Sequence, residues 1–439
     1  MARPTGEAVA SSEQSRPLRL FWQSITIAVL ATGYAGYYLC RSDLSVTLPI
    51  ISAELVSGGM DPATARLRLG SIASVGVLAY ALAKFASGSM ADLGGGRRNF
   101  LLGMGGSAVF TLAFALTGGS LPLMTLAWVG NRGIQATGWA GIVKVASRWF
   151  SRKTYGTVMA VLSLSFLFGD AAARAFIALL LAQGWSWRGV FFMAASMLAA
   201  LWLLTFCFLK ETPLDIGQVE PEINPGNLYG SEGARSVPAG LPQLFGPMLR
   251  NPSFQVACFL SLGFTLVRET FNLWTPTYFT QVLGLSPAEA AAKSAVFPLV
   301  GGISVVLVGS LSDRLGSASR SMMMFGGLAA SGAALLYLAF GRFSTVSAPI
   351  MLVALIGFLL IGPYSFLAGA VALDLGGRQG SATASGFIDG VGYLGGVLAG
   401  DSVARLSAAF GWSGAFIALG GVCFVSAAAA LFYRTRGNP

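Results

Sequence analysis

The sequence predicts an all-α membrane protein whose twelve transmembrane helices form two pseudo-symmetric six-helix bundles. Three observations support this prediction: the chain is strongly apolar, its apolar residues fall into twelve long segments, and its two halves repeat the same features. Hydrophobic residues make up 54% of the 439 residues and charged residues only 10%. A soluble globular protein carries about 25% charged residues. The composition therefore excludes a soluble enzyme, a disordered chain and a secreted disulfide scaffold.

Each apolar segment reaches the ~20 residues that a helix needs to cross the hydrocarbon core. The segments are expected at 22–50, 69–91, 99–118, 121–147, 154–183, 187–209, 253–282, 287–312, 320–341, 346–372, 380–407 and 411–433. A stretch rich in proline, glycine and acidic residues separates the sixth from the seventh. We therefore expect a polar tail (1–21), an N-terminal bundle (22–209), a linker (210–252), a C-terminal bundle (253–433) and a short tail (434–439).

The basic residues lie mostly in the loops that share one side with the N-terminus. The positive-inside rule then places both termini in the cytoplasm, and it explains the net charge of +10 without nucleic-acid binding. The chain has no histidine, the commonest zinc ligand, and we expect neither a metal nor a cofactor. Its four cysteines lie in apolar stretches and form no CxxC pair, so we expect them to be reduced and buried. A monomer in a bacterial inner membrane is the default expectation for such an alanine- and glycine-rich chain.

Two loops repeat one another, each after the second helix of its half. They read GSMADLGGGRR (88–98) and GSLSDRLGSASR (309–320). The glycines permit close helix contact, and the aspartates can accept hydrogen bonds from a helix N-terminus and from arginines. We predict a conformational gate here, although an ordinary basic turn is the alternative. The predicted gate consists of Gly88, Asp92, Arg97, Arg98, Gly309, Asp313 and Arg314.

Charged residues within the spans are the main functional evidence, because each is costly in a bilayer and usually faces a cavity or a partner. Arg41 and Arg268 hold equivalent positions on the first helix of each half, each eight residues before a proline. Two guanidinium groups facing each other would clamp an oxyanion through paired hydrogen bonds. The alternative is that each arginine pairs with a nearby acid such as Asp43 or Glu269.

Other polar residues accompany these arginines. Tyr80 and Lys84 are four residues apart, so they share a helix face and can add a donor and a charge to the cavity. Tyr34 and Tyr38 form one stripe with Arg41, whereas Tyr393 is a weaker candidate in the second half. Lys84 at a membrane edge and tyrosines that merely pack are the alternatives.

The acidic residues within the spans allow two interpretations, charge pairing and proton coupling. Asp170 and Arg174 have the i, i+4 spacing of an internal salt bridge, which we favour. Glu269 directly follows Arg268 and so points about 100° away around the helix, toward another cation or a proton. Without histidine, any proton carrier must be a carboxylate, and the candidates are Asp43, Asp170, Glu269 and Asp389. The role of Arg132 on the fourth span stays open.

No enzyme motif is present. The chain lacks a G-x-x-x-x-G-K-[ST] phosphate loop and a G-x-S-x-G nucleophile elbow, so neither ATP hydrolysis nor serine hydrolase chemistry is expected.

Several of these stretches together resemble the organophosphate:phosphate antiporters of the major facilitator superfamily. They read GYAGYYLCRSDLSVTLP, AYALAKFASGSMAD, GIQATGWAGIVKVASRWFS, LVRETFNLWTPTYF and IDGVGYLGGVLAG. The family's two phosphate-binding arginines match Arg41 and Arg268, and its lysine matches Lys84. Its tyrosines match Tyr34, Tyr38, Tyr80 and Tyr393. The resemblance implies that a rocker-switch exchanges internal phosphate for an external phosphate ester at a site between the two halves.

Some residues depart from that family's pattern. Ser165 stands where bacterial glycerol-phosphate members carry a histidine, and Ser42 where a lysine often follows the first arginine. The extra acidic residues suggest an amine-bearing phosphate or phosphonate, or proton coupling. RSDLSVTLPIISAEL and Arg132 are similar to proton-coupled symporters of sugar acids and other carboxylates, although Trp139 lies where those carry an acid. A nutrient sensor that binds its ligand without transport is a further alternative.

Overall fold

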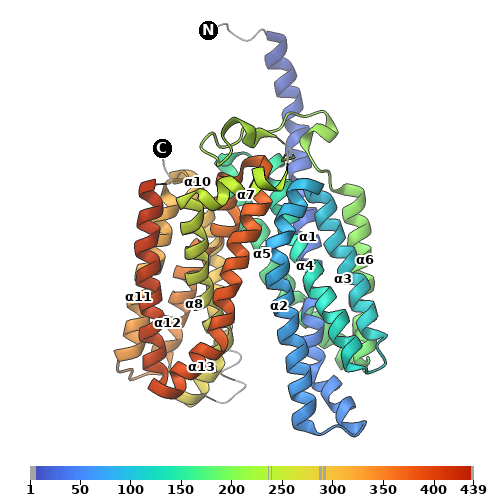
Figure 1. Ribbon diagram of the computed structural model, residues 1–439, viewed down its shortest axis with the longest axis vertical. Helices are drawn as coiled ribbons and strands as arrows, with labels where there is room; N and C mark the ends of the chain where they lie inside the picture. Colours follow the sequence, from blue (N-terminus) through green and yellow to red (C-terminus); the bar gives the residue numbers. More distant parts are fainter. Residues whose placement is uncertain (1–5, 236, 239, 286–288, 290–292, 437–439) are drawn as a thin grey trace. The chain divides into compact units, whose positions relative to one another are not determined.

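The computed structural model describes all residues except 1–5, 236, 239, 286–288, 290–292 and 437–439, and the part described is helical, with no strand (Figure 1). The long helices are α1 (Gly6–Ser57), α2 (Pro62–Gly94), α3 (Gly96–Ala115), α4 (Leu121–Trp149), α5 (Tyr155–Ala182), α6 (Trp187–Phe208), α8 (Pro252–Leu283), α10 (Val296–Leu315), α11 (Ser319–Phe340), α12 (Ser347–Tyr364) and α13 (Ala372–Arg436). Shorter turns are η1 (Arg152–Thr154), η2 (Pro213–Ile216), η3 (Gly230–Ala234), the ten-residue α7 (Leu241–Arg250) and the π-helical η4 (Leu367–Val371).

Each expected apolar segment overlaps at least one of these helices, and the segment expected at 346–372 runs over both α12 and η4. The last two segments share α13, which is interrupted at Gly377 (φ 57°) and Gly411 (φ 68°), where a left-handed backbone favours glycine. The first residues of the segment expected at 287–312 lie outside the described residues. By length and composition alone, 8 helical stretches of the described chain can cross a membrane. Helices α1, α3 and α4 are not among these stretches, and α1 and α4 carry charged residues within their expected spans.

The structure adds helix to two of the expected segments and corrects the expectation that all four cysteines are buried. Helix α1 begins at Gly6, so most of the expected polar tail is helical, because its alanine- and glutamate-containing sequence favours a helix. The expected linker contains η2, η3 and α7. Cys207 on α6 is exposed, and Cys258 on α8 is half-buried where it packs against the core of the second unit; of the four cysteines, Cys40 and Cys423 are buried.

The chain divides into two compact units. The first unit consists of the described residues up to 151 together with 165–223, and the second of 152–164 together with 224–439. In the first unit α4 packs against α2 and α3, and α6 packs against α1 and α3 (Figure 1). Helices α3 and α4 approach closely at Gly96 and Gly141, where a Cβ on Gly141 would lie 2.8 Å from the carbonyl oxygen of Gly96. Glycine at both positions lets the two backbones touch.

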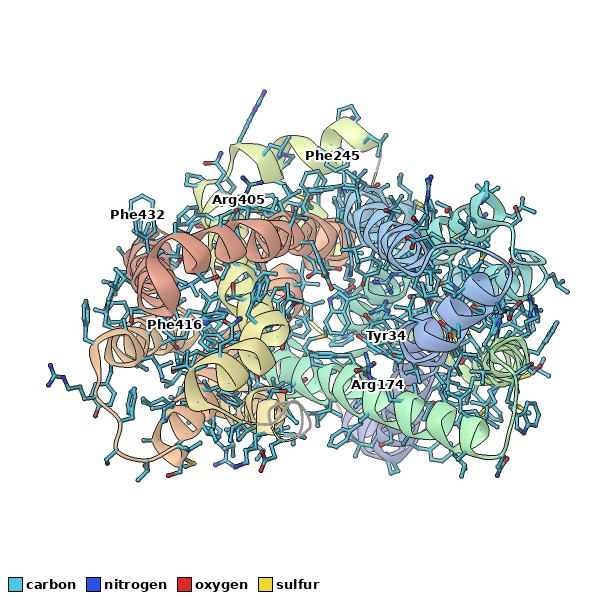
Figure 2. The ribbon with its side chains drawn as sticks, turned by 90° about the horizontal axis from the view of Figure 1, so that it is seen from below. Tyr34, Arg174, Phe245, Arg405, Phe416 and Phe432 are labelled. Carbon is cyan, nitrogen blue, oxygen red and sulfur yellow. The ribbon has the colours of Figure 1, made fainter. Side chains whose placement is uncertain are left out.

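In the second unit α8 packs against α13, α10 against α12, and α11 against α12 and α13. Its core includes three stacked aromatic rings, in which Phe271 lies 5.2 Å from Phe297 and 6.2 Å from Phe416, centroid to centroid. Figure 2 shows Phe416 inside this bundle and Phe432 pointing away from it, in agreement with exposures of 3% and 42%. Helices of this unit therefore present one apolar face to each other and another to the surroundings.

Several helices begin at a side-chain cap. Asp61 accepts the backbone N–H of Thr64 at the start of α2, and Asn251 accepts that of Phe254 at the start of α8. Each such cap stabilises a helix start by about 1 kcal/mol. The structure thus fixes where these spans begin more sharply than hydropathy does.

Candidate functional site

Three cations of the first unit surround the ring of Tyr80. The guanidinium carbon of Arg41 lies 5.0 Å from the ring centroid, that of Arg132 lies 4.9 Å away, and the ammonium nitrogen of Lys84 lies 4.9 Å away. Tyr80 and Lys84 are both 2% exposed. These side chains come from α1, α2 and α4, so the packing of three helices concentrates positive charge around one aromatic face. We call Arg41, Tyr80, Lys84 and Arg132 the cationic cluster.

A buried amide holds the two arginines of the cationic cluster together. Gln135 Oε1 accepts a hydrogen bond from Arg41 Nε at 2.9 Å and another from Arg132 Nη1 at 3.1 Å. Its Nε2 donates to the carbonyl oxygen of Cys40 at 2.9 Å and to Asn131 Oδ1 at 2.6 Å. Arg132, whose role the sequence left open, therefore belongs to the same cluster as Arg41. Gln135 was not a candidate, because a neutral amide in an apolar helix gives no charge signal.

The predicted tyrosines line the same part of the first unit. Tyr38 lies under Arg41, with 4.6 Å from the guanidinium carbon to its ring centroid, and its hydroxyl accepts a hydrogen bond from Arg41 Nη1 at 3.0 Å. Tyr34 packs against Tyr38 and Trp139, with ring centroids 6.0 and 5.6 Å away. Figure 2 shows Tyr34 within its bundle, where it is 4% exposed. Tyr34 therefore contributes packing, whereas Tyr38 contacts the arginine directly.

The corresponding arginine of the second unit is paired with its neighbour in the sequence. Arg268 donates to Glu269 Oε1 from Nε at 3.0 Å and from Nη2 at 2.6 Å. Its guanidinium carbon also lies 4.2 Å from the ring centroid of Tyr364. The sequence predicts that Glu269 points away from Arg268 around the helix, toward another cation or a proton. The two residues pair nevertheless, because both side chains are long and flexible enough to meet. The pairing alternative is thus the one that the structure forms for Arg268.

Two further candidates accompany Arg268. Asp389, which is 8% exposed, accepts a hydrogen bond of 3.4 Å from the Tyr364 hydroxyl, and Tyr393 is near enough to interact electrostatically with Arg268. The second unit therefore presents one arginine together with two carboxylates and two tyrosines. Its candidate site carries more acid than the cationic cluster of the first unit.

The remaining acidic candidates have two different environments. Asp170 accepts a hydrogen bond from Arg174 Nε at 2.9 Å, so the internal salt bridge favoured from the sequence is present. It is partly exposed, and Figure 2 shows Arg174 on α5. Asp43 is fully buried, and its Oδ1 accepts the N–H of Leu44. Its Oδ2 accepts no hydrogen bond from the described part of the chain, although Arg132 is near enough to interact with Asp43 electrostatically. Within the residues that the structure describes, no group of three or more potential metal ligands comes together.

The predicted gate of the second unit forms a helix cap. Asp313 accepts the backbone N–H groups of Gly156 at 2.8 Å and Thr157 at 2.6 Å, at the start of α5, and it pairs with Arg320 at 3.4 Å. A Cβ on Gly309 would lie 2.9 Å from the carbonyl oxygen of Gly156, so glycine permits this approach. Arg320, which the gate prediction did not include, also pairs with Asp374.

The gate of the first unit is built differently. Asp92 and Lys144 form a buried ion pair of 3.0 Å, so Lys144 has a structural role. Arg97 donates to the carbonyl oxygens of Leu209 and Phe206 at 2.7 and 2.6 Å. The N-terminus of α3 is capped by Glu211 instead of by Asp92. Gly88 is buried, whereas the predicted gate residues Arg98 and Arg314 are both exposed.

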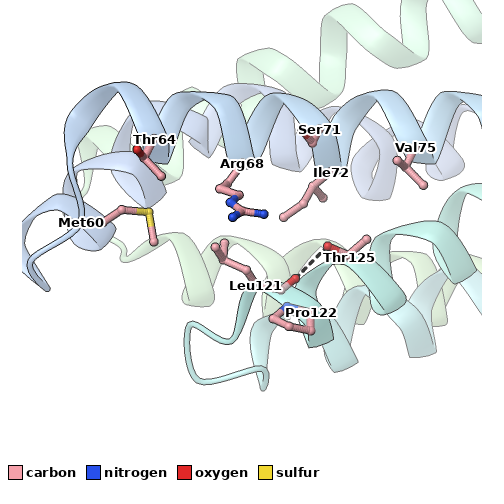
Figure 3. Close-up of a pocket in the computed structure, with 9 residues that line it drawn as sticks. All are labelled: Met60, Thr64, Arg68, Ser71, Ile72, Val75, Leu121, Pro122 and Thr125. Atoms are coloured by element: carbon pink, nitrogen blue, oxygen red, sulfur yellow. Dashed lines mark hydrogen bonds between the residues drawn. The ribbon is translucent and has the colours of Figure 1, made fainter.

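A separate pocket of about 490 Å³ lies between α2 and α4, away from every predicted substrate residue (Figure 3). Its lining combines one arginine, three hydroxyls and several apolar side chains: Met60, Thr64, Arg68, Ser71, Ile72, Val75, Leu121, Pro122 and Thr125. Thr125 donates its hydroxyl to the carbonyl oxygen of Leu121 at 2.8 Å within this lining. The cationic cluster is therefore the better candidate for an anion site, because it concentrates three charges.

Comparisons with known proteins agree with this architecture. The glycerol-3-phosphate transporter of Bacillus subtilis (strain 168) is 26% identical over 90% of this chain and 88% of its own. The membrane sensor protein UhpC of Escherichia coli (strain K12) is 24% identical over 95% of this chain and 94% of its own. The solved structure of the proton:xylose symporter XylE matches 96% of this chain and 98% of its own with a TM-score of 0.73, at 12% identity, and so shows the fold alone.

The family model of the Major Facilitator Superfamily matches residues 30–400, which is most of the chain. Together with the two-unit helical architecture, this match identifies the class of molecule. The chain belongs to the major facilitator superfamily and is an integral membrane transporter, not an enzyme.

Proposed function

We propose that this protein exchanges a phosphate ester for inorganic phosphate by alternating access. The observation that supports this proposal most strongly is the cationic cluster, which gathers two guanidinium groups and one ammonium group around a single ring. Phosphate groups carry about two negative charges at neutral pH and accept paired hydrogen bonds from arginine. The chain is similar to the glycerol-3-phosphate transporter of Bacillus subtilis, which supports the same substrate class.

In this mechanism Arg41 and Arg268 bind the anion. Lys84, Tyr38 and Tyr80 of the first unit contribute further contacts to it. Arg268 exchanges part of its pairing with Glu269 for the substrate, while Tyr34 and Tyr393 shape the surroundings. The 22–209 and 253–433 bundles then rock about the bound anion. The glycine–aspartate loops, with the Asp313 cap on α5, stabilise one of the two conformations. Both termini face the cytoplasm of a bacterial inner membrane, and the transporter works as a monomer.

Reconstitution into liposomes tests this proposal. We expect labelled phosphate to enter vesicles that contain unlabelled phosphate and to enter empty vesicles far more slowly, because an unneutralised cationic site reorients poorly. Phosphate esters should compete. Arg41→Lys keeps the charge but loses the planar fork, so phosphate should bind more weakly by about 1–3 kcal/mol. Equal entry into loaded and empty vesicles would refute exchange.

Proton-coupled symport of an organic anion is the second candidate, and Asp43 is the observation that favours it. A fully buried carboxyl with a partnerless oxygen is costly when charged, so it is a natural position for a proton. Asp43→Asn should then abolish uptake driven by a pH gradient and spare exchange. If the amides at Asp43, Asp170, Glu269 and Asp389 all leave pH-driven uptake unchanged, symport is excluded. Saturable binding without any flux would instead indicate a sensor.

A further inference from the structure

Arg132 contributes as directly to the cationic cluster as Arg41 does. Its guanidinium carbon is 4.9 Å from the centroid of the Tyr80 ring, compared with 5.0 Å for Arg41. Lys84, Arg41 and Arg132 all lie near this one centroid, so no two of the three cations can be farther apart than the sum of their distances from it. Like charges this close repel each other in a partly buried site. A ligand with two negative charges relieves more of this repulsion than a ligand with one.

The orientation of Gln135 is set by its four hydrogen bonds. Its oxygen accepts from both arginines, and its nitrogen donates to the Cys40 carbonyl oxygen and to Asn131. Turning the amide over would put donors against two guanidinium groups and an oxygen against a carbonyl, so only one orientation is satisfied. Asn131 is itself held by Thr111 on α3, at 2.8 Å. The amide therefore fixes the spacing of the two guanidinium groups.

Among the described residues, the candidate site around Arg268 in the second unit has no comparable surplus of positive charge. Arg268 is bonded to Glu269 through two of its nitrogens, and Asp389 adds a further carboxylate nearby. The formal charge of Arg268, Glu269 and Asp389 together is negative. Arg41, Lys84 and Arg132 remain net positive even when Asp43, which interacts electrostatically with Arg132, is counted with them. The preference for anions of higher charge is therefore expected to come from the first unit. Arg132 strengthens this preference because it adds a third cation to Arg41 and Lys84.

We propose that Arg132, positioned by Gln135, is a substrate-binding residue that selects dianions: phosphate monoesters or phosphonates are bound in preference to phosphodiesters and monocarboxylates. This inference rests on the proposed function, because it assumes that the cationic cluster binds the transported anion. Gln135 is a positioning residue, since it acts through the two guanidinium groups. The attraction between ligand and cluster grows with the ligand's charge, and removal of one of three cations lowers it most for the dianion.

The test is competition against labelled inorganic phosphate bound to the purified full-length protein. Glycerol phosphate and its methyl diester share an organic part but differ by one charge at pH 8. The wild type should prefer the monoester, and Arg132→Gln should reduce the ratio of the two affinities by about tenfold to a hundredfold. Arg132→Lys should retain most of the ratio. Gln135→Leu should reduce it while all three cations remain. Arg235→Gln removes a positive charge from an exposed linker pair and should leave the ratio unchanged.

One measurement on the wild type tests the preference for dianions even if a variant does not fold. Affinity for glycerol phosphate should rise with pH through the second ionisation of the ester, at about 6. A flat profile, or an unchanged ratio in folded Arg132→Gln, overturns the role of Arg132 and leaves the proposed function standing. Failure of the wild type to bind phosphate or either ester overturns the proposed function itself.

Discussion

The buried ion pair between Asp92 and Lys144 gives the sharpest stability prediction. Both side chains are at most 1% exposed, and their charged atoms are 3.0 Å apart. At an effective dielectric constant of about 20, such charges attract by about 5–6 kcal/mol. Much of this attraction offsets the cost of removing both ions from water. Asp92→Asn leaves the lysine buried and charged, and so should lower the free energy of unfolding by about 3–5 kcal/mol.

The assay is unfolding of the purified protein in mixed micelles, followed by tryptophan fluorescence. The double variant Asp92→Asn with Lys144→Met removes both charges and should recover most of the loss, because no unpaired ion then remains. Glu232→Gln breaks a pair in which both side chains are more than half exposed, and it should cost less than about 1 kcal/mol. If Asp92→Asn costs no more than Glu232→Gln, or if the double variant is the least stable, the reasoning is wrong.

Three further predictions concern the loops and helix starts. Arg188, together with an indole N–H, holds the pKa of Glu54 below its usual value, so this pair contributes stability above about pH 4.3 and loses it as pH falls through the lowered pKa. Arg188→Gln should therefore reduce the loss of unfolding free energy at acid pH by less than about 1 kcal/mol, since Glu54 is partly exposed. Melting temperatures measured against pH should then fall less steeply on the acid side than in the wild type, and a steeper fall would contradict this. Asp313→Asn should destabilise the start of α5 by about 1.5–3 kcal/mol, visible as faster amide hydrogen exchange there and not on α3. Gly309→Ala would put a Cβ 2.6 Å from that of Ala160, so its melting temperature should fall below that of Gly326→Ala, a glycine with open space around it; equal values would refute the close contact.

The spans were predictable because a helix that crosses the hydrocarbon core needs a minimum length of apolar sequence, and that length can be read from the hydropathy of the chain. The charged residues of the two candidate sites were also visible, since Arg41, Lys84 and Arg268 stand out in apolar helices. Gln135 was not, because its importance depends on α1 and α4 packing side by side, which no local pattern encodes. Glu269 was placed by the position of its Cα on the helix, whereas the flexibility of two long side chains decides its partner.

The pair formed by Arg268 and Glu269 has a consequence for how charge is handled during transport. Its two members are consecutive residues of α8, so a rigid-body movement of that helix carries both and cannot separate them. Glu269 therefore continues to neutralise the charge of Arg268 wherever α8 moves. In the cationic cluster, by contrast, Arg41 and Arg132 meet through Gln135 across α1 and α4, and any sliding of these helices alters how their charges are spaced. The affinity of the cationic cluster for an anion therefore depends on how far α1 and α4 are displaced, whereas the bond between Arg268 and Glu269 does not sense such a displacement.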